Sequence, residues 1–414
     1  MKDWSVMVAV ALISTVAYSC SRHVDTPVIP KTLDAPVAPM TLNGPKATEV
    51  VATLETPIPV GKNAIWCASF LAAWKTLMEQ VTQEPVSLEG QGGLVPSLNS
   101  APDPRPAVPQ AALYVASGWK QEGIIERIQR ELVQKFPSKQ APTFPGAISD
   151  SFIAYSYLEA SVKFSLPYFQ NRQALEFTDA EGRKTPVVSF GIRPEDDYAY
   201  YKLRAQPQIL FRKGEEREGS LEFAIDLCPD SEPSQIVVAR INREPTLAAA
   251  VARVDMESKE MDARGRGQPD YAKYLRKVGP NDVLLVPNLF WQLSHHFSEL
   301  EGKKFTNAKL KGQRLDVAQQ DILFRLDRSG AELKSESKMY CSPIPTYFVL
   351  DHPYLIFLRQ RGAQAPYFAM WVDNSELLSN WQKETSVKPS GAMNVSQPIR
   401  SETNRTSAAA GSTH

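Results

Sequence analysis

The chain has 414 residues, and its 46 lysine and arginine residues are balanced by 46 aspartate and glutamate residues. A neutral chain without a basic face is a poor partner for nucleic acid, so we expect no nucleic-acid binding. Its 4 cysteines are too few to imply a disulfide framework. The length would allow two or three average domains, but no linker-like break interrupts residues 62–382, which favours one large domain that mixes helices and sheets.

The first residues have the features of an export signal. A weakly charged start leads into an apolar run from Val6 to Ala17, which is too short for a membrane span, and small residues and Cys20 follow. The Ala-Tyr-Ser-Cys ending resembles a bacterial lipoprotein cleavage site with Cys20 as the lipidated residue, while an ordinary cleaved signal and a single anchor helix are the alternatives. We expect residues 1–20 to be a signal peptide, and the protein to be extracellular, periplasmic or lipid-anchored at the cell envelope. Such an anchor would be its only contact with a membrane.

Two polar or proline-rich segments flank the predicted domain. Residues 21–61 are rich in proline, valine, alanine and threonine. Because proline lacks a backbone N–H, we expect a semi-extended tether with no helix and no interior strand. Residues 383–414 are rich in serine, threonine and asparagine with little apolar content, so we expect a disordered polar tail.

Between these segments, hydrophobic periodicity predicts alternating helices and strands. Apolar residues three and four positions apart indicate a helix with one buried face, and strict alternation indicates a half-buried strand. The expected elements are a core helix with Phe70, Trp74, Leu77 and Met78 on one face, a helix at 123–136 ended by Pro137, a strand at 220–228, a helix at 247–254 and a strand at 282–291.

Residues 321–372 combine a strand, a polar stretch and a hairpin. Ile322, Phe324 and Leu326 alternate with their neighbours as in a half-buried strand, and only Leu323 breaks the pattern. Residues 331–345 are too charged for a core, so we expect a long exposed loop, which in a domain is usually functional or disordered. The aromatic and branched runs 347–359 and 366–372 are separated by a turn and predict a core hairpin.

The search for catalytic motifs is negative. The sequence has no Gly-x-Ser-x-Gly elbow, no His-Glu-x-x-His helix, no Cys-x-x-Cys pair and no phosphate-binding glycine loop. Adjacent His295 and His296 on a helix would point to different faces and could not both bind one ion. His352 between Asp351 and Pro353 indicates an oriented structural imidazole. We therefore expect no enzyme, no metal site and no cofactor.

The end of the chain resembles a known family. Asp351-His352-Pro353-Tyr354, followed by a turn and a second aromatic strand, resembles the carboxy-terminal signature of the serpins, in which an Asp-His-Pro-Phe-type strand pair closes the chain. Residues 323–332 resemble the strand and hinge that lead into the serpin reactive loop, with Gly330 at the hinge glycine. The Asn63-led apolar strand and the helix after it resemble the first conserved serpin segment. Residues 149–164 resemble the central strand of the family. Residues 282–291 resemble the serpin strand that precedes a short helix, so the resemblance implies a helix at 295–302. On these residues the chain is identified as a divergent, bacterial-type exported member of the serpin family.

The resemblance implies a serpin-like α+β domain with mixed β-sheets, surrounding helices and an exposed reactive loop. It also implies inhibition of a serine endopeptidase, which cleaves the loop before the freed segment inserts as a new strand into the main sheet. At about 3.3 Å per residue, insertion of residues 331–345 would move the cut end by about 50 Å. The partner is then a serine peptidase, and we expect a monomer. The expected hinge residues are Gly330, Ala331, Leu333 and Ser335. The candidate scissile region is Lys338, Met339, Tyr340, Cys341 and Ser342.

Several departures from the family pattern support a second interpretation. Cys67-Ala68 replaces a Ser-Pro pair whose serine, in the family, belongs to the shutter, the region under the main sheet that controls its opening. Ala154 replaces an asparagine and Val162 a tryptophan where the sheet parts or the loop enters. The loop also carries four charged residues within 332–338, where inhibitory members have small residues. The alternative is a non-inhibitory serpin-fold binding or scaffold protein of the cell envelope. A third interpretation is an unrelated α+β envelope lipoprotein with a chance carboxy-terminal match.

Overall fold

The computed structural model describes residues 38–90, 92–137, 139–145, 147–149, 151–194, 200–214, 221–264, 266, 274–328 and 345–381. All of them belong to one compact unit of the chain. Their strands form a six-stranded, a seven-stranded and a four-stranded sheet and a separate two-stranded ribbon. The mixture of sheets and helices agrees with the α+β class predicted from the sequence.

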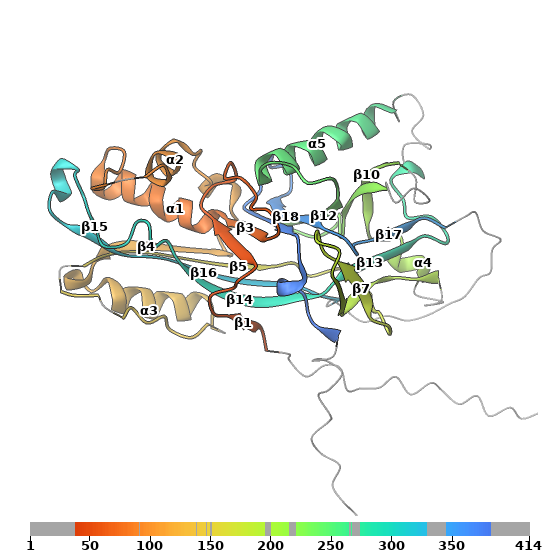
Figure 1. The fold of residues 1–414 in the computed structure, drawn as a ribbon, viewed down its shortest axis with the longest axis horizontal. Helices are drawn as coiled ribbons and strands as arrows, with labels where there is room; N and C mark the ends of the chain where they lie inside the picture. Colours follow the sequence, from red (N-terminus) through yellow and green to blue (C-terminus); the bar gives the residue numbers. More distant parts are fainter. Residues whose placement is uncertain are drawn as a thin grey trace, which may run out of the picture. The chain divides into compact units, whose positions relative to one another are not determined.

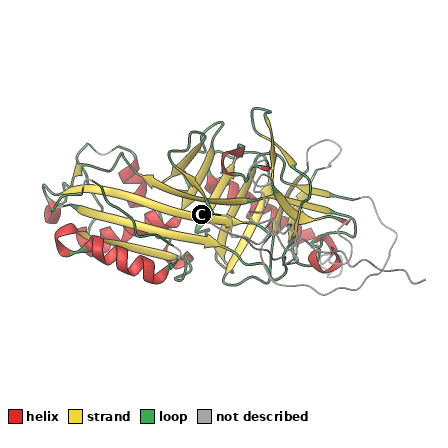
Figure 2. Ribbon diagram, turned by 90° about the horizontal axis from the view of Figure 1, so that it is seen from below, coloured by secondary structure: helices red, strands yellow, loops and turns green. Residues whose placement is uncertain are grey.

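The six-stranded sheet, called the main sheet below, contains the longest strand of the described chain. Its strands in spatial order are β1 (Met40–Leu42), β14 (Leu289–His296), β16 (Arg314–Leu326), β5 (Phe152–Ser161) and β4 (Leu113–Trp119), with β15 (Lys303–Lys304) paired to the start of β16. The long strands lie side by side in Figure 2. β16 and β5 run parallel, whereas β14 with β16 and β4 with β5 run antiparallel.

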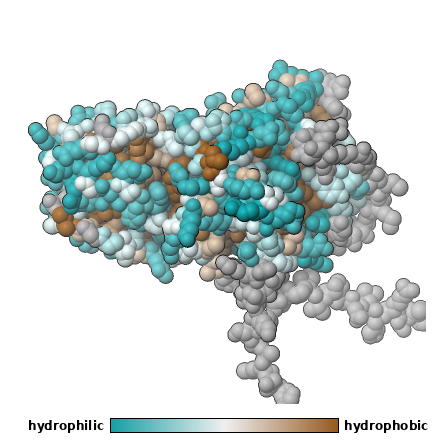
Figure 3. All heavy atoms as spheres, viewed as in Figure 1, coloured by the Kyte–Doolittle hydropathy of each residue, from teal (hydrophilic) through white to brown (hydrophobic). Residues whose placement is uncertain are grey.

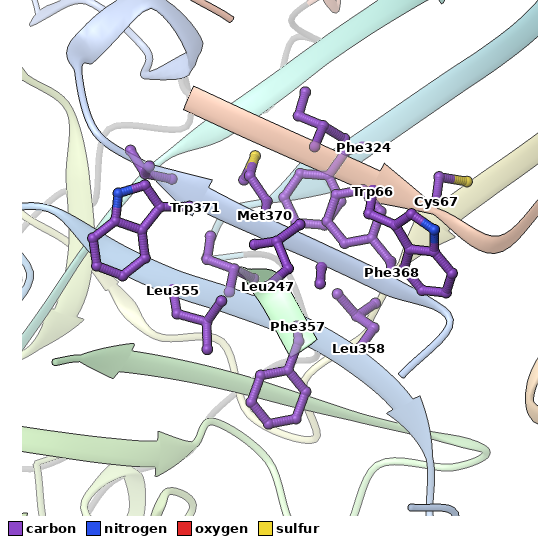
Figure 4. Packing of buried hydrophobic residues seen from close by; sticks show 14 of the residues in the cluster. Trp66, Cys67, Leu247, Phe324, Leu355, Phe357, Leu358, Phe368, Met370 and Trp371 are labelled. Carbon is purple, nitrogen blue, oxygen red and sulfur yellow. The ribbon is translucent and has the colours of Figure 1, made fainter. Parts of the chain in front are cut away.

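The seven-stranded sheet packs against the main sheet through large apolar side chains. Its order is β10 (Gln208–Lys213), β11 (Glu222–Asp226), β12 (Ser234–Arg240), β18 (Tyr354–Gln360), β19 (Phe368–Val372), β3 (Asn63–Cys67) and β2 (Thr48–Val51). Phe324 of β16 stacks on Phe368 of β19, with ring centroids 4.7 Å apart and an interplanar angle of 13°. Figure 4 shows this contact among the buried residues of the core.

The four-stranded sheet depends on one glycine. Its order is β17 (Tyr347–Val349), β13 (Val283–Pro287), β9 (Ser189–Ile192) and β6 (Phe169–Gln170), and the ribbon is β7 (Leu175–Thr178) with β8 (Lys184–Val187). A Cβ atom at Gly191 would lie 1.8 Å from the carbonyl oxygen of Leu284, so only glycine allows the two strands to approach this closely.

Helices cover both faces of the main sheet. The helices are α1 (Ala68–Leu77), continued by a π-helical turn at Met78–Thr82, then α2 (Leu94–Ser100), α3 (Ile124–Lys135), α4 (Tyr200–Leu203) and α5 (Leu247–Arg264), with 3-10 turns at Arg105–Ala107, Lys120–Glu122, Ala308–Leu310 and Ser375–Leu377. Figure 1 shows α1 and α3 on opposite faces of the main sheet. The α3 side chains Ile124, Ile128 and Leu132 are buried in a small hydrophobic cluster with residues of β4, β5 and β16. We call the face of the main sheet under α3 the outer face, and the face toward α1 the inner face.

The surface on the side seen in Figure 3 is mainly hydrophilic, and hydrophobic residues show there only as small patches. No helix in the described part of the chain is long and apolar enough to cross a membrane.

Most predicted elements of the domain are present. The core helix, the helix ended by Pro137, the central strand and the strand at 220–228 correspond to α1, α3, β5 and β11, and the helix predicted at 247–254 is longer, as α5. The carboxy-terminal hairpin is β18 paired with β19. Its predicted first run is divided, however, because Tyr347–Val349 belongs to the four-stranded sheet as β17, and only the residues after Pro353 enter the hairpin.

The predicted helix at 295–302 is wrong. His295 and His296 are the last residues of β14, where they pair with Gln320 and Gln319 of β16. The alternation of buried Trp291 and Leu293 with less buried neighbours continues to the end of this strand. The strand predicted at 282–291 is in fact two strands, β13 and the start of β14, which belong to different sheets.

The segment predicted to be a tether contributes to the fold. Within residues 21–61, the structure places β1 and β2 at the edges of the main and seven-stranded sheets. An edge strand needs a partner on only one side, so a short proline-free piece is sufficient, and Pro45, Pro57 and Pro59 fall outside both strands. The segment is also held by Glu376, whose carboxylate accepts hydrogen bonds from Lys46 N, Ala47 N and Thr48 Oγ1. Residues 1–37 and 382–414, and therefore the predicted signal peptide and polar tail, lie outside the described residues.

Candidate functional site

The strands β5 and β16 form a parallel pair of long strands inside the main sheet. Its register runs from Phe152 opposite Leu315 to Ser161 opposite Arg325, so the two strands are paired along the whole of β5. We call this pair the seam. β16 ends at Leu326, and the chain continues into residues 329–344, which lie outside the described residues. The strand that borders the seam is therefore also the strand that leads into the predicted reactive loop.

A buried polar cluster lies under the inner face of the seam. Gln320 Nε2 of β16 donates hydrogen bonds to the Cys67 carbonyl oxygen at 3.1 Å and to Ser69 Oγ at 2.8 Å. The Cys67 thiol and the Ser69 hydroxyl are themselves 3.1 Å apart. Burial raises the pKa of the Cys67 thiol to about 11, so it is neutral at physiological pH. The cluster ties the start of α1 to the centre of β16.

Two polar atoms of the seam have no hydrogen-bond partner among the described residues. They are Ser156 Oγ of β5 and Gln320 Oε1 of β16, and their residues are opposite each other in the register and fully buried. An unsatisfied buried polar group destabilises the folded state by about 1–3 kcal/mol. The centre of the seam is therefore less stable than an apolar pair of the same shape would be.

A second polar cluster covers the outer face of the seam around Asp321. Its carboxylate accepts hydrogen bonds from Tyr155 Oη at 2.8 Å, Ser294 Oγ at 2.6 Å and Gln319 Nε2 at 2.9 Å. Lys139 Nζ, from the segment that joins α3 to β5, lies 3.1 Å from Asp321 Oδ2. The cluster thus brings together β5, β14, β16 and the segment after α3.

The electrostatics of this cluster favour a charged carboxylate. Burial acts to raise the pKa of Asp321, but the charge of Lys139 and the hydrogen bonds from Ser294, Gln319 and Tyr155 outweigh it, so the pKa lies below its ordinary value. Burial and the neighbouring Asp321 charge raise the pKa of Tyr155, which therefore remains a donor. A charged, partnered Asp321 is the state present at neutral pH.

Aromatic packing adds to the cover over the seam. Phe136, at the end of α3, meets the Tyr157 ring edge to face with centroids 4.8 Å apart, and Lys139 Nζ lies 5.0 Å from the centre of the same ring. Phe144 packs against Tyr155 at 5.7 Å. The chain between α3 and β5 is therefore held against the outer face at several points.

The structure brings some of the residues singled out in the sequence together at the seam. Cys67 lies in the inner-face cluster, and Ala154 pairs with Ala318 within the seam, where the family pattern has an asparagine. Val162 follows the end of β5 and is half-buried. The lipidation residue Cys20, the hinge residues Gly330, Ala331, Leu333 and Ser335, and the scissile candidates Lys338, Met339, Tyr340, Cys341 and Ser342 all lie outside the described residues.

Sequence reasoning missed the polar residues that define both clusters. Ser69 and Gln320 are 251 positions apart, and Tyr155 and Asp321 are 166 apart, so periodicity could not have paired them. A signal was present, because Gln319, Gln320 and Asp321 form a polar run directly before an apolar strand pattern. The apolar alternation predicts a strand that starts at Asp321, whereas all three residues are buried within β16.

The histidines and cysteines of the described chain form no metal centre. No three histidine, cysteine, aspartate or glutamate side chains of these residues are placed to hold an ion together. His352 Nδ1 lies 2.8 Å from Asp351 Oδ1, which also binds Arg240 at 3.1 Å. Cys67 and Cys228 are free thiols and both are buried.

Comparisons with known proteins find similarity in structure only. No protein-family model and no curated protein sequence matches the chain. Mouse protein-Z dependent protease inhibitor is similar at 12% identity over 75% of this chain and 91% of that chain, with a TM-score of 0.44. Thyroxine-binding globulin in complex with thyroxine is similar at 11% identity over 76% of this chain and 93% of that chain, with a TM-score of 0.44. Serpin48, a serpin of the insect Tenebrio molitor, is similar at 10% identity over 75% and 92%, with a TM-score of 0.42. The match to native protease nexin-1 with heparin covers 65% of that chain.

The described residues form an α+β domain with several mixed sheets, and the α+β class predicted from the sequence is confirmed.

Proposed function

We propose that the protein is an exported inhibitor of serine endopeptidases, and that a loop cleaved by the target peptidase inserts into the seam. In this proposal it is not an enzyme, needs no cofactor and acts as a monomer. Residues 1–20 direct its export, and lipidation at Cys20 keeps it at the cell envelope, with residues between Cys20 and β1 as the tether.

The observation that carries the proposal is the direction of the strands at the seam. A segment that follows β16 and folds back beside it runs antiparallel to β16, and therefore antiparallel to β5 as well. Insertion would replace one parallel pair by two antiparallel pairs, which are slightly more stable per residue, and would add the hydrogen bonds of a whole strand. The unpartnered atoms of Ser156 and Gln320 would be separated and gain new neighbours. In this proposal, an added strand at the seam lowers the free energy.

A second candidate function is a binding or scaffold protein of the cell envelope that never inserts its loop. The observation that favours it is the closed seam, which is fully paired and covered by the Asp321 cluster. The four charged residues within 332–338 would also slow the transit of the loop. The two candidates differ in whether the seam opens fast enough to trap a peptidase.

Trapping experiments separate the two functions. The full-length protein is incubated with serine peptidases that cleave after lysine, methionine or tyrosine, which are the residues offered by 338–340. Inhibition by insertion predicts an acyl-enzyme complex that survives denaturing electrophoresis, and no complex with a peptidase whose catalytic serine is replaced by alanine. An Ala331→Asp variant places a charge in the predicted hinge and should convert the protein into a substrate. Cleavage without a stable complex for every peptidase would exclude inhibition and leave the binding or scaffold function.

A further inference from the structure

We propose that the ion pair of Lys139 with Asp321 is a latch that keeps the seam closed and sets the rate at which it opens. The inference concerns the regulation of the seam, and it rests on the proposed function in that the seam is where the loop would insert. The residues that form the latch all lie within the described part of the chain. The rate at which the seam opens can be measured without any peptidase.

The latch joins the two sides of the seam through one buried carboxylate. The Asp321 side chain is 5% exposed and that of Lys139 is 21% exposed. Asp321 belongs to β16, whereas Tyr155, which donates to it, belongs to β5 on the other side of the seam. Lys139 lies between the end of α3 and the start of β5, so the chain connects it to the β5 side. Two of the four partners of the carboxylate therefore lie on the side opposite to β16.

Opening of the seam must break both of these interactions. Neighbouring strands are about 4.8 Å apart, so an added strand moves β5 and β16 apart by a further distance of that size. The Tyr155 hydrogen bond at 2.8 Å and the Lys139 contact at 3.1 Å cannot span this gap. Ser294 and Gln319 remain, but they bring no positive charge. A buried carboxylate that loses its cation is strongly unfavourable, and this cost falls on the opening step.

Two other ion pairs of the same strand provide a comparison. Arg314 pairs with Asp316 at the start of β16, and Arg325 pairs with Asp327 at its end, so these pairs do not connect β16 to β5. They are therefore no obstacle to separation of the two strands. The latch is more buried than these two pairs, and it crosses the seam, whereas they do not. A substitution in one of the two pairs therefore serves as a matched control.

Hydrogen exchange of the full-length native protein tests the latch. In Lys139→Met, backbone amides of β5 and β16 should exchange about tenfold faster or more, because the closed seam now holds an uncompensated carboxylate. Amides of the β18–β19 hairpin should change little. Arg314→Met should leave exchange at the seam unchanged, and Lys139→Arg should restore most of the wild-type protection because it retains the charge.

Three outcomes would overturn the latch. Wild-type exchange at the seam in Lys139→Met means that the ion pair does not limit opening. If the amides of β18–β19 exchange faster by the same factor, the variant only destabilises the whole domain. If Arg314→Met accelerates exchange at the seam as much as Lys139→Met does, an ion pair need not cross the seam to have this effect.

If Lys139→Met fails to fold, Asp321→Asn removes the charge without leaving a buried carboxylate, and faster exchange at the seam alone is again expected. Faster opening of the seam together with no trapped peptidase would support the latch while excluding the proposed inhibition, so the two claims fail separately.

Discussion

Ser156 and Gln320 lie opposite each other across the seam, and each buries one polar atom that has no hydrogen-bond partner among the described residues. This relationship predicts that Ser156→Ala stabilises the protein, because the substitution removes an unsatisfied hydroxyl and little volume. The expected gain in the free energy of unfolding is about 1 kcal/mol. Urea unfolding measures it directly.

Ser294→Ala is the matched control, because the Ser294 hydroxyl donates to Asp321 at 2.6 Å and its loss should destabilise the protein by about 1–3 kcal/mol. If both substitutions changed the free energy of unfolding in the same direction, the predicted difference between the two serines would be wrong.

Asn63, the first residue of β3, connects the start of this strand to the residues just after β19. Its Oδ1 accepts hydrogen bonds from the backbone N–H groups of Asp373 at 2.7 Å and Asn374 at 2.9 Å, and its Nδ2 donates to Thr48 Oγ1 and Asn374 Oδ1. Asn63→Ala leaves these buried groups unsatisfied and should lower the free energy of unfolding by about 3 kcal/mol. Asn242 is exposed, so Asn242→Ala should change the same quantity by less than about 0.5 kcal/mol. Equal effects of the two substitutions would show that the Asn63 hydrogen bonds do not hold the start of β3 to the residues after β19.

Phe324 connects the main sheet to the seven-stranded sheet through its stack on Phe368 and a tilted contact with Trp291 at 5.6 Å. Phe324→Ala should destabilise the domain by about 3–5 kcal/mol, since it removes a fully buried ring and leaves a cavity. Phe324→Leu retains most of the volume and should cost less. Chemical denaturation of both variants checks the order, and an equal loss in the two would mean that the volume retained by leucine contributes nothing, which would contradict the prediction.

His295 should make the stability depend on pH. Its ring packs edge to face on Phe297 with centroids 4.6 Å apart, and burial lowers its pKa, although the charge of Glu299 opposes this shift. Below an unfolded-state pKa of about 6.5, the unfolded chain takes up a proton that the folded chain does not bind. The free energy of unfolding should therefore fall as the pH decreases through about 6.5, until the folded-state pKa is reached.

The measurement is urea unfolding at several values between about pH 7.5 and pH 5. In His295→Gln this part of the pH dependence should disappear, whereas His352→Gln retains His295 and should also retain the dependence. An unchanged slope in His295→Gln would contradict the prediction.

Local pattern was sufficient for the elements whose apolar residues repeat along one segment. The stripes of α1 and α3 and the hairpin of β18 and β19 follow from such repeats, whereas the central strand β5 was expected from the family resemblance. The predictions that were wrong concern β1, β2 and the end of β14. They have a common cause, because the positions of these strands depend on partners that are far away in the sequence. β1 and β2 are strands only because β14 and β3 offer free edges, and β14 continues to His296 because β16 lies beside it.

The candidate site was predictable only in part. Cys67 and Ala154 could be placed near the opening of the sheet through a family resemblance, without any contact being known. The seam itself joins two strands that are distant in sequence, and its polar residues look like strand boundaries when they are read locally. A buried polar group is recognisable as functional only when its partners on other strands are known.

We propose that the main sheet is poised to accept a new strand at the seam. Thermal unfolding of the full-length protein before and after limited cleavage within Lys338 to Ser342 tests this proposal. The account predicts a large rise in melting temperature after cleavage, because the freed segment enters the seam and forms two antiparallel pairs. An unchanged or lower melting temperature would show that the segment stays out of the sheet, and the binding or scaffold function would then replace inhibition.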